Sequence, residues 1–152
     1  MLAILEGSSS QEELKQCEKC YLEEMGAGGA SNETRYNYAK SIIKCGRVFR
    51  HDLDRAILLL EDLCVSSDRE SQKDYLFNLA IANTRIGQYA RAEECIKKFM
   101  VLEPGNRQAH ELYDIIQAKT RKEHLKEAAV AGGTAILIGG LVGLGLALAT
   151  RR

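Results

Sequence analysis

The sequence predicts an all-α protein, a six-helix mini-solenoid followed by a C-terminal transmembrane helix. Three observations support this fold class. The chain of 152 residues has one proline and few runs of β-branched residues, whereas an all-β sandwich needs many turns rich in glycine and proline. Apolar residues recur at the three- and four-residue spacing of amphipathic helices through most of the N-terminal part. Residues 128–150 carry no charge.

The formal net charge of zero averages over two unlike segments. All 21 acidic residues and 19 of the 21 basic residues lie in residues 1–127, and Arg151 and Arg152 complete the basic set. No basic excess is available to hold nucleic acid, and the sequence has none of the usual nucleic-acid-binding motifs. We therefore expect a mildly acidic helical domain joined to an apolar segment.

Ser10 and Glu13 form an S-x-x-E capping box at the start of the first predicted helix. The apolar stripe of this helix comprises Leu14, Cys17, Tyr21, Leu22 and Met25. A glycine-rich stretch at residues 26–29 ends it. Residues 1–9 precede it as a short N-terminal arm.

Five further helices follow at short intervals, which indicates antiparallel neighbours. The second runs from about Ser31 to Lys44, and the third follows Asp52. The fourth and fifth lie on either side of Gly87, and the sixth begins after Pro104.

The fourth and fifth helices match a 34-residue tetratricopeptide unit. With Pro104 at position 32 of the unit, position 1 falls on Lys73. The small residues Ala80 and Ala92 then occupy positions 8 and 20, where the two helices of a pair approach closely. Gly87 permits the turn between the helices, and Pro104 ends the second one.

The second and third helices form an earlier and more degenerate copy of this unit. Ala39 and Ala56 take the places of the two small residues but stand 17 positions apart rather than 12. This spacing predicts about five extra residues in the turn between the two helices. The first and sixth helices are expected to cap the two repeats, since fewer than three repeats rarely form a stable unit.

Residues 128–150 are predicted to span a membrane. As a helix they are about 34 Å long, enough to cross a hydrocarbon core of about 30 Å. Because the segment comes last, we expect it to insert after translation and to leave the helical domain of residues 10–120 in the cytosol, joined through a juxtamembrane linker of residues 121–127. Residues 151–152, Arg151 and Arg152, form a basic targeting tail. A weakly apolar span with basic flanks is more typical of tail anchors in the mitochondrial outer membrane or the peroxisomal membrane than of those in the endoplasmic reticulum.

Small residues recur every four positions within this span. They are Ala131, Ala135, Gly139, Gly143 and Ala147. A helix face of this kind favours helix–helix contact in the membrane and hence a homo-oligomer. The same residues also lower the hydrophobicity of an anchor, and the sequence leaves both interpretations open.

A solenoid of stacked helix pairs binds partners on its concave face, which the first helix of each pair lines. The repeat frame predicts a partner-binding face made of Glu33, Tyr36, Asn37, Lys40, Ile43, Lys44, Asp74, Phe77, Asn78, Ile81, Thr84 and Arg85. Arg85 is the expected anchor, because arginine is over-represented among binding hot spots. The alternative is that Arg85 and Lys44 are ordinary solvated residues.

The N-terminal arm offers a second hypothesis. Its apolar residues Leu2, Ile4 and Leu5 could fold into the concave groove and compete with a partner. They could instead pack onto the first helix as a hydrophobic staple or remain frayed.

No cofactor, metal site or catalytic group is expected. The five cysteines are an odd number in a domain expected in the reducing cytosol, so they do not indicate a disulfide framework. Cys17-x-x-Cys20 lacks a second pair to complete a zinc site. No nucleophile–base pair or paired carboxylates can be assembled, so the sequence does not predict an enzyme.

Taken together, these segments make the chain resemble the mitochondrial fission 1 protein family. The resemblance covers nearly all of the chain and rests on the first helix with its Ser10 cap, on Tyr38-Ala39, on residues 57–63, on Asp74-Tyr75 and on residues 103–112. It implies a tail-anchored outer-membrane adaptor of mitochondria and peroxisomes that recruits division machinery, a dynamin-related GTPase or its partner proteins. Asn78 departs from the family, which often has an aromatic residue there.

Two other functions remain open from the sequence. The chain could be a tetratricopeptide receptor for chaperones or import clients, although such receptors usually have three repeats and a basic clamp for a terminal carboxylate. It could also be a membrane-remodelling oligomer that acts through the small-residue face of its anchor.

Overall fold

The computed structural model describes the backbone of residues 11–46, 48–66 and 68–149, and the side chains of these residues as far as Val130, apart from Ser66. The chain divides into two compact units, Met1–Gln117 and Ala118–Arg152. The predicted Ser10 cap and the arm residues Leu2, Ile4 and Leu5 lie outside the described residues.

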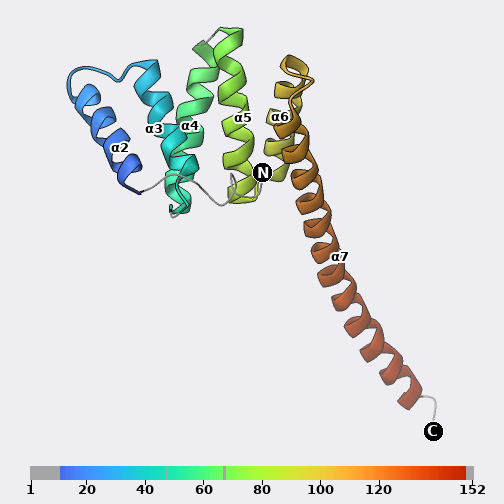
Figure 1. Cartoon of the computed structure of the whole chain (residues 1–152). Helices are drawn as coiled ribbons and strands as arrows, with labels where there is room; N and C mark the ends of the chain where they lie inside the picture. The colour runs from blue at the N-terminus through green and yellow to red at the C-terminus, as the bar shows by residue number, and fades with distance from the viewer. Residues whose placement is uncertain (1–10, 47, 67, 150–152) are drawn as a thin grey trace. The chain divides into compact units, whose positions relative to one another are not determined.

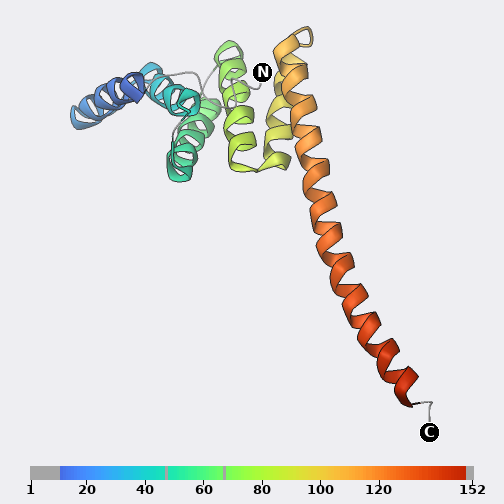
Figure 2. The same ribbon diagram turned by 60° about the horizontal axis from the view of Figure 1, so that its bottom comes forward.

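Six helices make up the described chain, which confirms the all-α prediction (Figure 1). They are α2 (Gln11–Gly26), α3 (Asn32–Lys44), α4 (Arg50–Ser66), α5 (Arg69–Ile86), α6 (Tyr89–Leu102) and α7 (Arg107–Ala149). In the first unit, helices α2 to α6 stand side by side in chain order, and Figure 2 shows the same succession from a second direction. The first unit is therefore a stack of antiparallel helix pairs.

Each of these helices packs on its neighbour in the sequence, and α3 also contacts α5. The predicted small residues lie at the tightest points: Ala39, Ala56, Ala80 and Ala92 are all fully buried. Larger side chains fill the rest of the core. Those least exposed to solvent are Ile42, Ile43, Leu60, Leu63, Ile96, Leu112 and Ile116. The last two come from the first turns of α7, which closes the second helix pair as the predicted cap.

Two helix starts follow directly from local capping chemistry. Ser31 is the N-cap of α3, and its hydroxyl oxygen accepts a hydrogen bond from the Thr34 amide at 3.2 Å. Asp68 caps α5 in the same way, through the Ser71 amide at 2.8 Å. Each side chain satisfies an amide that has no partner within the helix.

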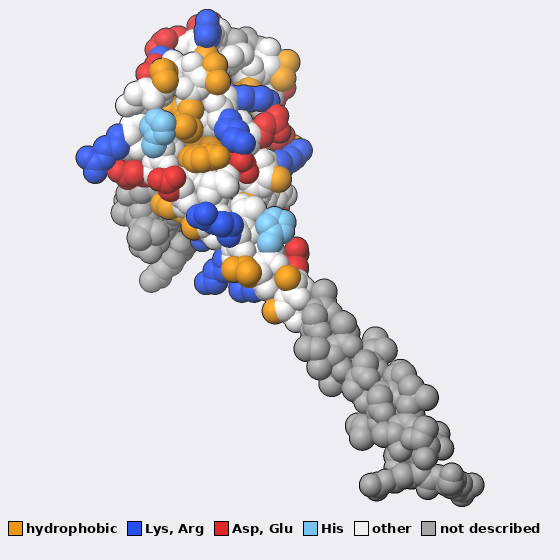
Figure 3. All heavy atoms as spheres, turned by 90° about the vertical axis from the view of Figure 1, so that its right-hand side faces the viewer, with side chains coloured by type: hydrophobic (Ala, Val, Ile, Leu, Met, Phe, Trp, Pro, Cys, Tyr) orange, Lys and Arg blue, Asp and Glu red, His pale blue; other side chains and the backbone are white. Residues whose placement is uncertain are grey.

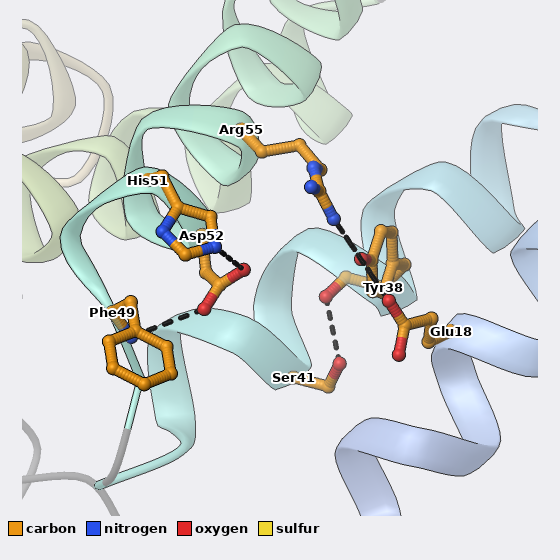
Figure 4. Close-up of polar contacts among 7 residues, drawn as sticks. All are labelled: Glu18, Tyr38, Ser41, Phe49, His51, Asp52 and Arg55. Atoms are coloured by element: carbon orange, nitrogen blue, oxygen red, sulfur yellow. Dashed lines mark hydrogen bonds and ion pairs between the residues drawn. The ribbon is translucent and has the colours of Figure 1, made fainter.

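The predicted start of the third helix was wrong by three residues. α4 begins at Arg50, so Asp52 lies in its first turn rather than before it. The Asp52 carboxylate accepts a hydrogen bond from the Phe49 amide at 3.1 Å, as Figure 4 shows. This contact is the reaching-back half of a capping box, in which the third helical residue satisfies the amide of the cap residue.

The two inter-helix turns differ by less than the sequence spacing predicted. Residues 45–49 join α3 to α4, and residues 87–88 join α5 to α6, so the first turn is three residues longer. The helix starts account for most of the remaining difference: α4 begins six residues before Ala56, whereas α6 begins three residues before Ala92. Gly87 ends α5 in the left-handed conformation, with φ of 83°, as its predicted turn role requires.

Helix α2 packs only partly against the stack. None of its residues is buried; Leu14, Cys17 and Tyr21 contact the core, whereas Leu22 and Met25 are exposed. In the described part of the chain, α3 is the main neighbour of α2, and contact with one helix covers only part of the apolar stripe.

Polar contacts tie α2 to the next two helices (Figure 4). The Tyr38 hydroxyl donates to Glu18 Oε1 at 3.1 Å and accepts from Arg55 Nη1 at 3.0 Å, and the Tyr21 ring stacks on the Tyr38 ring with centroids 4.8 Å apart. At the other end of α2, the Glu24 carboxylate accepts hydrogen bonds from the Ser31 amide and the Thr34 hydroxyl.

The second unit contains the C-terminal part of α7. Over the described residues, no helix offers a stretch long and apolar enough to cross a membrane. The side chains of residues 131–152 lie outside the described part of the chain. They include most of the predicted span and the predicted packing and targeting residues Ala135, Gly139, Gly143, Ala147, Arg151 and Arg152.

Candidate functional site

An open groove lies along the faces of α3 and α5 that the repeat frame assigned to the concave side. It encloses about 320 Å³. Its lining residues are Tyr36, Lys40, Ile43 and Lys44 from α3, Asp74, Phe77, Asn78 and Ile81 from α5, and Gln108 from the first turn of α7. The structure thus brings eight predicted residues together in one groove, because residues four apart on each helix share a face.

Gln108 is not among the residues predicted for the binding face. The repeat frame covers two repeats only, and it assigns the sixth helix the role of a cap. Extending the 34-residue period by one unit from Lys73 places position 1 on Arg107 and position 2 on Gln108, the position that Asp74 occupies in the preceding repeat. The signal was therefore present in the spacing.

Aromatic side chains support the apolar part of the groove. The ring centroids of Tyr36 and Tyr75 are 5.1 Å apart, and those of Phe77 and Phe99 are 5.2 Å apart. Asn78, which departs from the aromatic residue expected there, donates its amide hydrogens to Tyr36 Oη at 3.3 Å and to the Asp74 carbonyl at 2.8 Å. These contacts hold the tyrosine ring in place within the groove.

The surroundings of Tyr36 disfavour its ionised form. Burial, together with the nearby negative charge of Asp74, raises the pKa of Tyr36 to about 12. Its hydroxyl, protonated at neutral pH like that of any tyrosine, thus stays protonated into the alkaline range.

The charged side chains of the groove are divided between its two walls, which are formed by α3 and α5. Lys40 and Lys44 lie on α3, and Lys40 Nζ is 5.3 Å from the centroid of the Tyr36 ring. Asp74 lies on α5. Among the described residues, none of these three groups forms an ion pair within 4.0 Å.

Arg85 and Thr84 do not line this groove. The Arg85 guanidinium donates to the carbonyl oxygens of Ile43 and Cys45, the second at 3.0 Å, and burial lowers its pKa. The Thr84 hydroxyl is buried and donates to the Ala80 carbonyl at 2.7 Å. Arg85 therefore joins the end of α5 to the C-terminal carbonyls of α3, rather than standing free as the anchor that the sequence led us to expect.

Glu33 and Asn37 also lie outside the lining of the groove. Both are exposed on α3. Glu33 lies one helical turn before Tyr36, beyond the N-terminal end of the lining, and Asn37 directly follows Tyr36 without lining the groove, so the frame overextended the binding face.

A second hollow of about 400 Å³ lies among α4, α5 and α6 and is mainly apolar. It is lined by Cys64, Gln72, Leu76, Lys98, Val101 and Leu102. Burial raises the pKa of the Cys64 thiol and raises that of nearby Cys95 to about 11, so both thiols are protonated and unreactive at neutral pH. The sequence analysis did not predict this hollow, although the exposed Val65 and Val101 are apolar residues on helices that form it.

The exposed surface mixes charged and apolar side chains. On the face shown in Figure 3, acidic and basic side chains are interspersed around a small hydrophobic patch, without a large region of one sign. Within the part of the chain that the structure describes, no group of three or more His, Cys, Asp or Glu side chains is arranged to hold a metal ion.

Comparison with known proteins places this fold. The family model for the Fis1 C-terminal tetratricopeptide repeat matches residues 73–125, beginning at the residue that the repeat frame puts at position 1. The mitochondrial fission 1 proteins of Mus musculus and Homo sapiens are each 36% identical to the chain over 149 residues, which is 97% of both sequences. The chain belongs to the mitochondrial fission 1 protein family. The resemblance stated from the sequence is thereby confirmed.

Solved structures of the mitochondrial fission 1 family share the fold. The crystal structure of Fis1 from Saccharomyces cerevisiae superimposes with a TM-score of 0.68 at 22% identity and covers 81% of this chain and 92% of that one. Yeast Fis1 in complex with an Mdv1 fragment gives a TM-score of 0.69 at 22% identity, over 79% and 91% of the two chains. The stack of helix pairs is thus the family fold.

Proposed function

We propose that this protein is a non-catalytic adaptor of mitochondrial fission that binds a segment of the division machinery in the groove between α3 and α5. The observation that carries the proposal is the groove itself, in which apolar side chains lie beside unpaired charges. Such a surface suits an amphipathic segment of another protein. Membership of the mitochondrial fission 1 family supports the cellular role, and the yeast Fis1–Mdv1 complex supports an adaptor protein as the class of partner.

The partner is either a dynamin-related GTPase or an adaptor protein that recruits it. In both cases the protein acts by raising the local concentration of the division machinery at the membrane. A receptor for chaperones or import clients is the weaker candidate, because a clamp for a terminal carboxylate needs clustered cations, whereas this groove places Asp74 opposite its two lysines.

Residues 128–150 serve as the membrane anchor in this proposal, with residues 121–127 as linker and residues 151–152 as basic tail. The anchor holds the helical unit on the cytosolic side of the mitochondrial outer membrane and, by the same chemistry, of the peroxisomal membrane. Its support is the run of 23 uncharged residues, which exceeds the length needed to cross a bilayer. A fluorescently tagged full chain should outline mitochondria, and a chain truncated after residue 127 should be diffuse. A full chain that stays diffuse would rule out the anchor.

The groove is tested by blocking its mouth. Gln108 is exposed and lines the groove, so Gln108→Trp places a bulky ring there without altering the core. Arg107→Trp is the matched control, because Arg107 is the exposed neighbour outside the lining. Overexpression of the wild-type chain and of the control should fragment mitochondria, whereas Gln108→Trp at equal abundance should leave them elongated. Equal fragmentation by both variants would refute the proposed groove.

Two further roles concern residues outside the described structure. The arm residues Leu2, Ile4 and Leu5 would act as an internal competitor for the groove, and deletion of residues 2–7 should then raise partner affinity. An unchanged affinity would exclude that role. The small-residue face of Ala135, Gly139, Gly143 and Ala147 would support a homo-oligomer, which Gly139→Leu with Gly143→Leu should dissociate while leaving partner binding intact.

A further inference from the structure

We infer that the groove between α3 and α5 selects an amphipathic helical segment of a partner protein that carries acidic side chains along the edge facing α3. This inference rests on the proposed function, because it specifies the partner of the same groove. It follows from three features of the groove: two cations on one wall, a carboxylate on the other, and an apolar floor between them.

The α3 wall presents two available cations. Lys40 and Lys44 are four residues apart, so they lie on one face of the helix one turn from each other. Both line the groove, and neither has a carboxylate within 4.0 Å among the described residues. The contact of Lys40 with the Tyr36 ring, 5.3 Å from its centroid, keeps the ammonium beside the groove.

The α5 wall has the opposite charge. Asp74 is exposed at the groove. The neighbouring Lys73 cannot neutralise it, because Lys73 Nζ is engaged by Glu70 at 2.6 Å and by Glu103 at 2.7 Å. An acidic side chain near α5 would therefore be repelled, while the same side chain near α3 would be attracted.

The floor selects for apolar side chains. Tyr36 and Phe77 are partly exposed and present apolar surface to the groove, and the buried Ile43 and Ile81 complete its lining. The volume of about 320 Å³ is at the lower end for ligand pockets, so it admits a few side chains of a segment rather than a folded domain. An amphipathic helix meets these conditions, since residues at i, i+3, i+4 and i+7 form one apolar face and flanking positions carry the charges.

A pair of synthetic helical peptides tests this selection. Both have leucines at i, i+3, i+4 and i+7, and the positions along one edge are glutamates in the acidic peptide and lysines in the basic peptide. Binding to the full chain in a mild detergent is measured by fluorescence anisotropy in 50 mM and 500 mM NaCl. We expect the acidic peptide to bind about fivefold more tightly at the lower salt concentration, as two exposed ion pairs allow, and this preference should largely vanish at the higher one.

Variants of each wall identify the charges responsible. Lys40→Gln with Lys44→Gln should weaken the acidic peptide about fivefold and leave the basic one unchanged or slightly tighter. Asp74→Asn should weaken the basic peptide only. Lys15→Gln is the matched control, because Lys15 is an exposed lysine of α2 outside the groove, and it should change neither affinity. If the double variant has a lower melting temperature than the wild-type chain, the single variant Lys44→Gln replaces it in the binding measurements.

The possible failures are distinguishable. Equal affinities for the two peptides, with both lost in Gln108→Trp, would refute the charge selection and leave the proposed groove intact. Binding of neither peptide, or binding that Gln108→Trp does not affect, would refute the groove and with it the proposed function.

Discussion

Replacement of Arg85 by alanine should destabilise the helical unit. The guanidinium donates to the carbonyl oxygens of Ile43, the second-last residue of α3, and of Cys45, the C-cap that follows the helix. The helix itself leaves such carbonyls without partners. Arg85 therefore acts as a cap for α3 that is supplied by α5, from about forty residues further along the chain.

The expected loss is about 2.5 kcal/mol in the free energy of unfolding. A hydrogen bond to a charged group contributes about 1.5–3 kcal/mol, so two bonds set an upper bound of about 6 kcal/mol. The Arg85 side chain is partly buried, so desolvation of the guanidinium offsets part of this gain. A loss of about 2.5 kcal/mol corresponds to a melting temperature about 10 °C lower for a unit of this size.

Circular dichroism at 222 nm measures the effect, by thermal and urea unfolding of the full chain in a mild detergent. Arg91→Ala is the control, because Arg91 Nη1 lies 3.7 Å from Glu61 Oε1 on the surface, where an ion pair contributes less than about 1 kcal/mol. Arg85→Lys keeps the charge but loses the two-pronged donor, so it should fall between the wild type and Arg85→Ala.

An Arg85→Ala variant within about 0.5 kcal/mol of the wild type would contradict this reasoning. If the same variant lost partner binding, Arg85 would be the binding anchor expected from the repeat frame. If Arg85→Ala strongly lowered the free energy of unfolding while the folded fraction still bound the partner, the structural role of Arg85 would be confirmed.

Three other perturbations follow from individual contacts. The pKa of Tyr36 is raised to about 12, so its contribution to stability is complete below pH 10 and is lost as the pH rises from 10 to 12. Tyr36→Phe should therefore flatten the decline of the melting temperature over that range, and an unchanged slope would exclude Tyr36 as the source of the decline. Hydrogen bonds from Thr34 and Ser31 lower the pKa of Glu24 below its usual value of 4.5, so its contribution to stability is present above that pH and is lost as the pH falls through the lowered value. Glu24→Gln should therefore reduce the acid sensitivity of unfolding, and an unchanged acid sensitivity would exclude Glu24 as its source. Gly87→Ala should lower the free energy of unfolding in urea by about 1 kcal/mol because Gly87 has a φ of 83°, although the added methyl group has open space. Gly105→Ala has equal space and no positive φ, so it should be neutral, and equal losses for the two variants would show that backbone conformation is not the cause.

The helices and their ends could be predicted from the sequence because the signals for them lie close together in the chain. Ser31 caps the helix that follows it, Gly87 adopts the one backbone conformation that a side chain disfavours, and Ala80 and Ala92 mark where two helices approach. Each of these features depends on residues within one or two helical turns. The 34-residue period then extended the local pattern to the groove, because equivalent positions in successive repeats face the same side.

The repeat frame failed where the chain departs from the regular unit. α4 starts at Arg50 because Asp52 can reach the Phe49 amide, which adds helix where the spacing indicated loop. Gln108 differs, because the chain keeps the period there: the 34-residue spacing continues into α7, beyond the two repeats of the frame.

By itself, the sequence determined the helices, the repeat and the uncharged C-terminal segment, since periodicity, caps and charge placement act over a few residues at a time. Only the tertiary structure decided which polar side chains form internal hydrogen bonds and which remain available for binding. Arg85 and Lys44 are indistinguishable as basic residues at the ends of their helices, yet Arg85 reaches the carbonyls of Ile43 and Cys45, while Lys44 remains available in the groove. The difference depends on which backbone groups lie within reach after two helices about forty residues apart have packed together, and no local pattern encodes it.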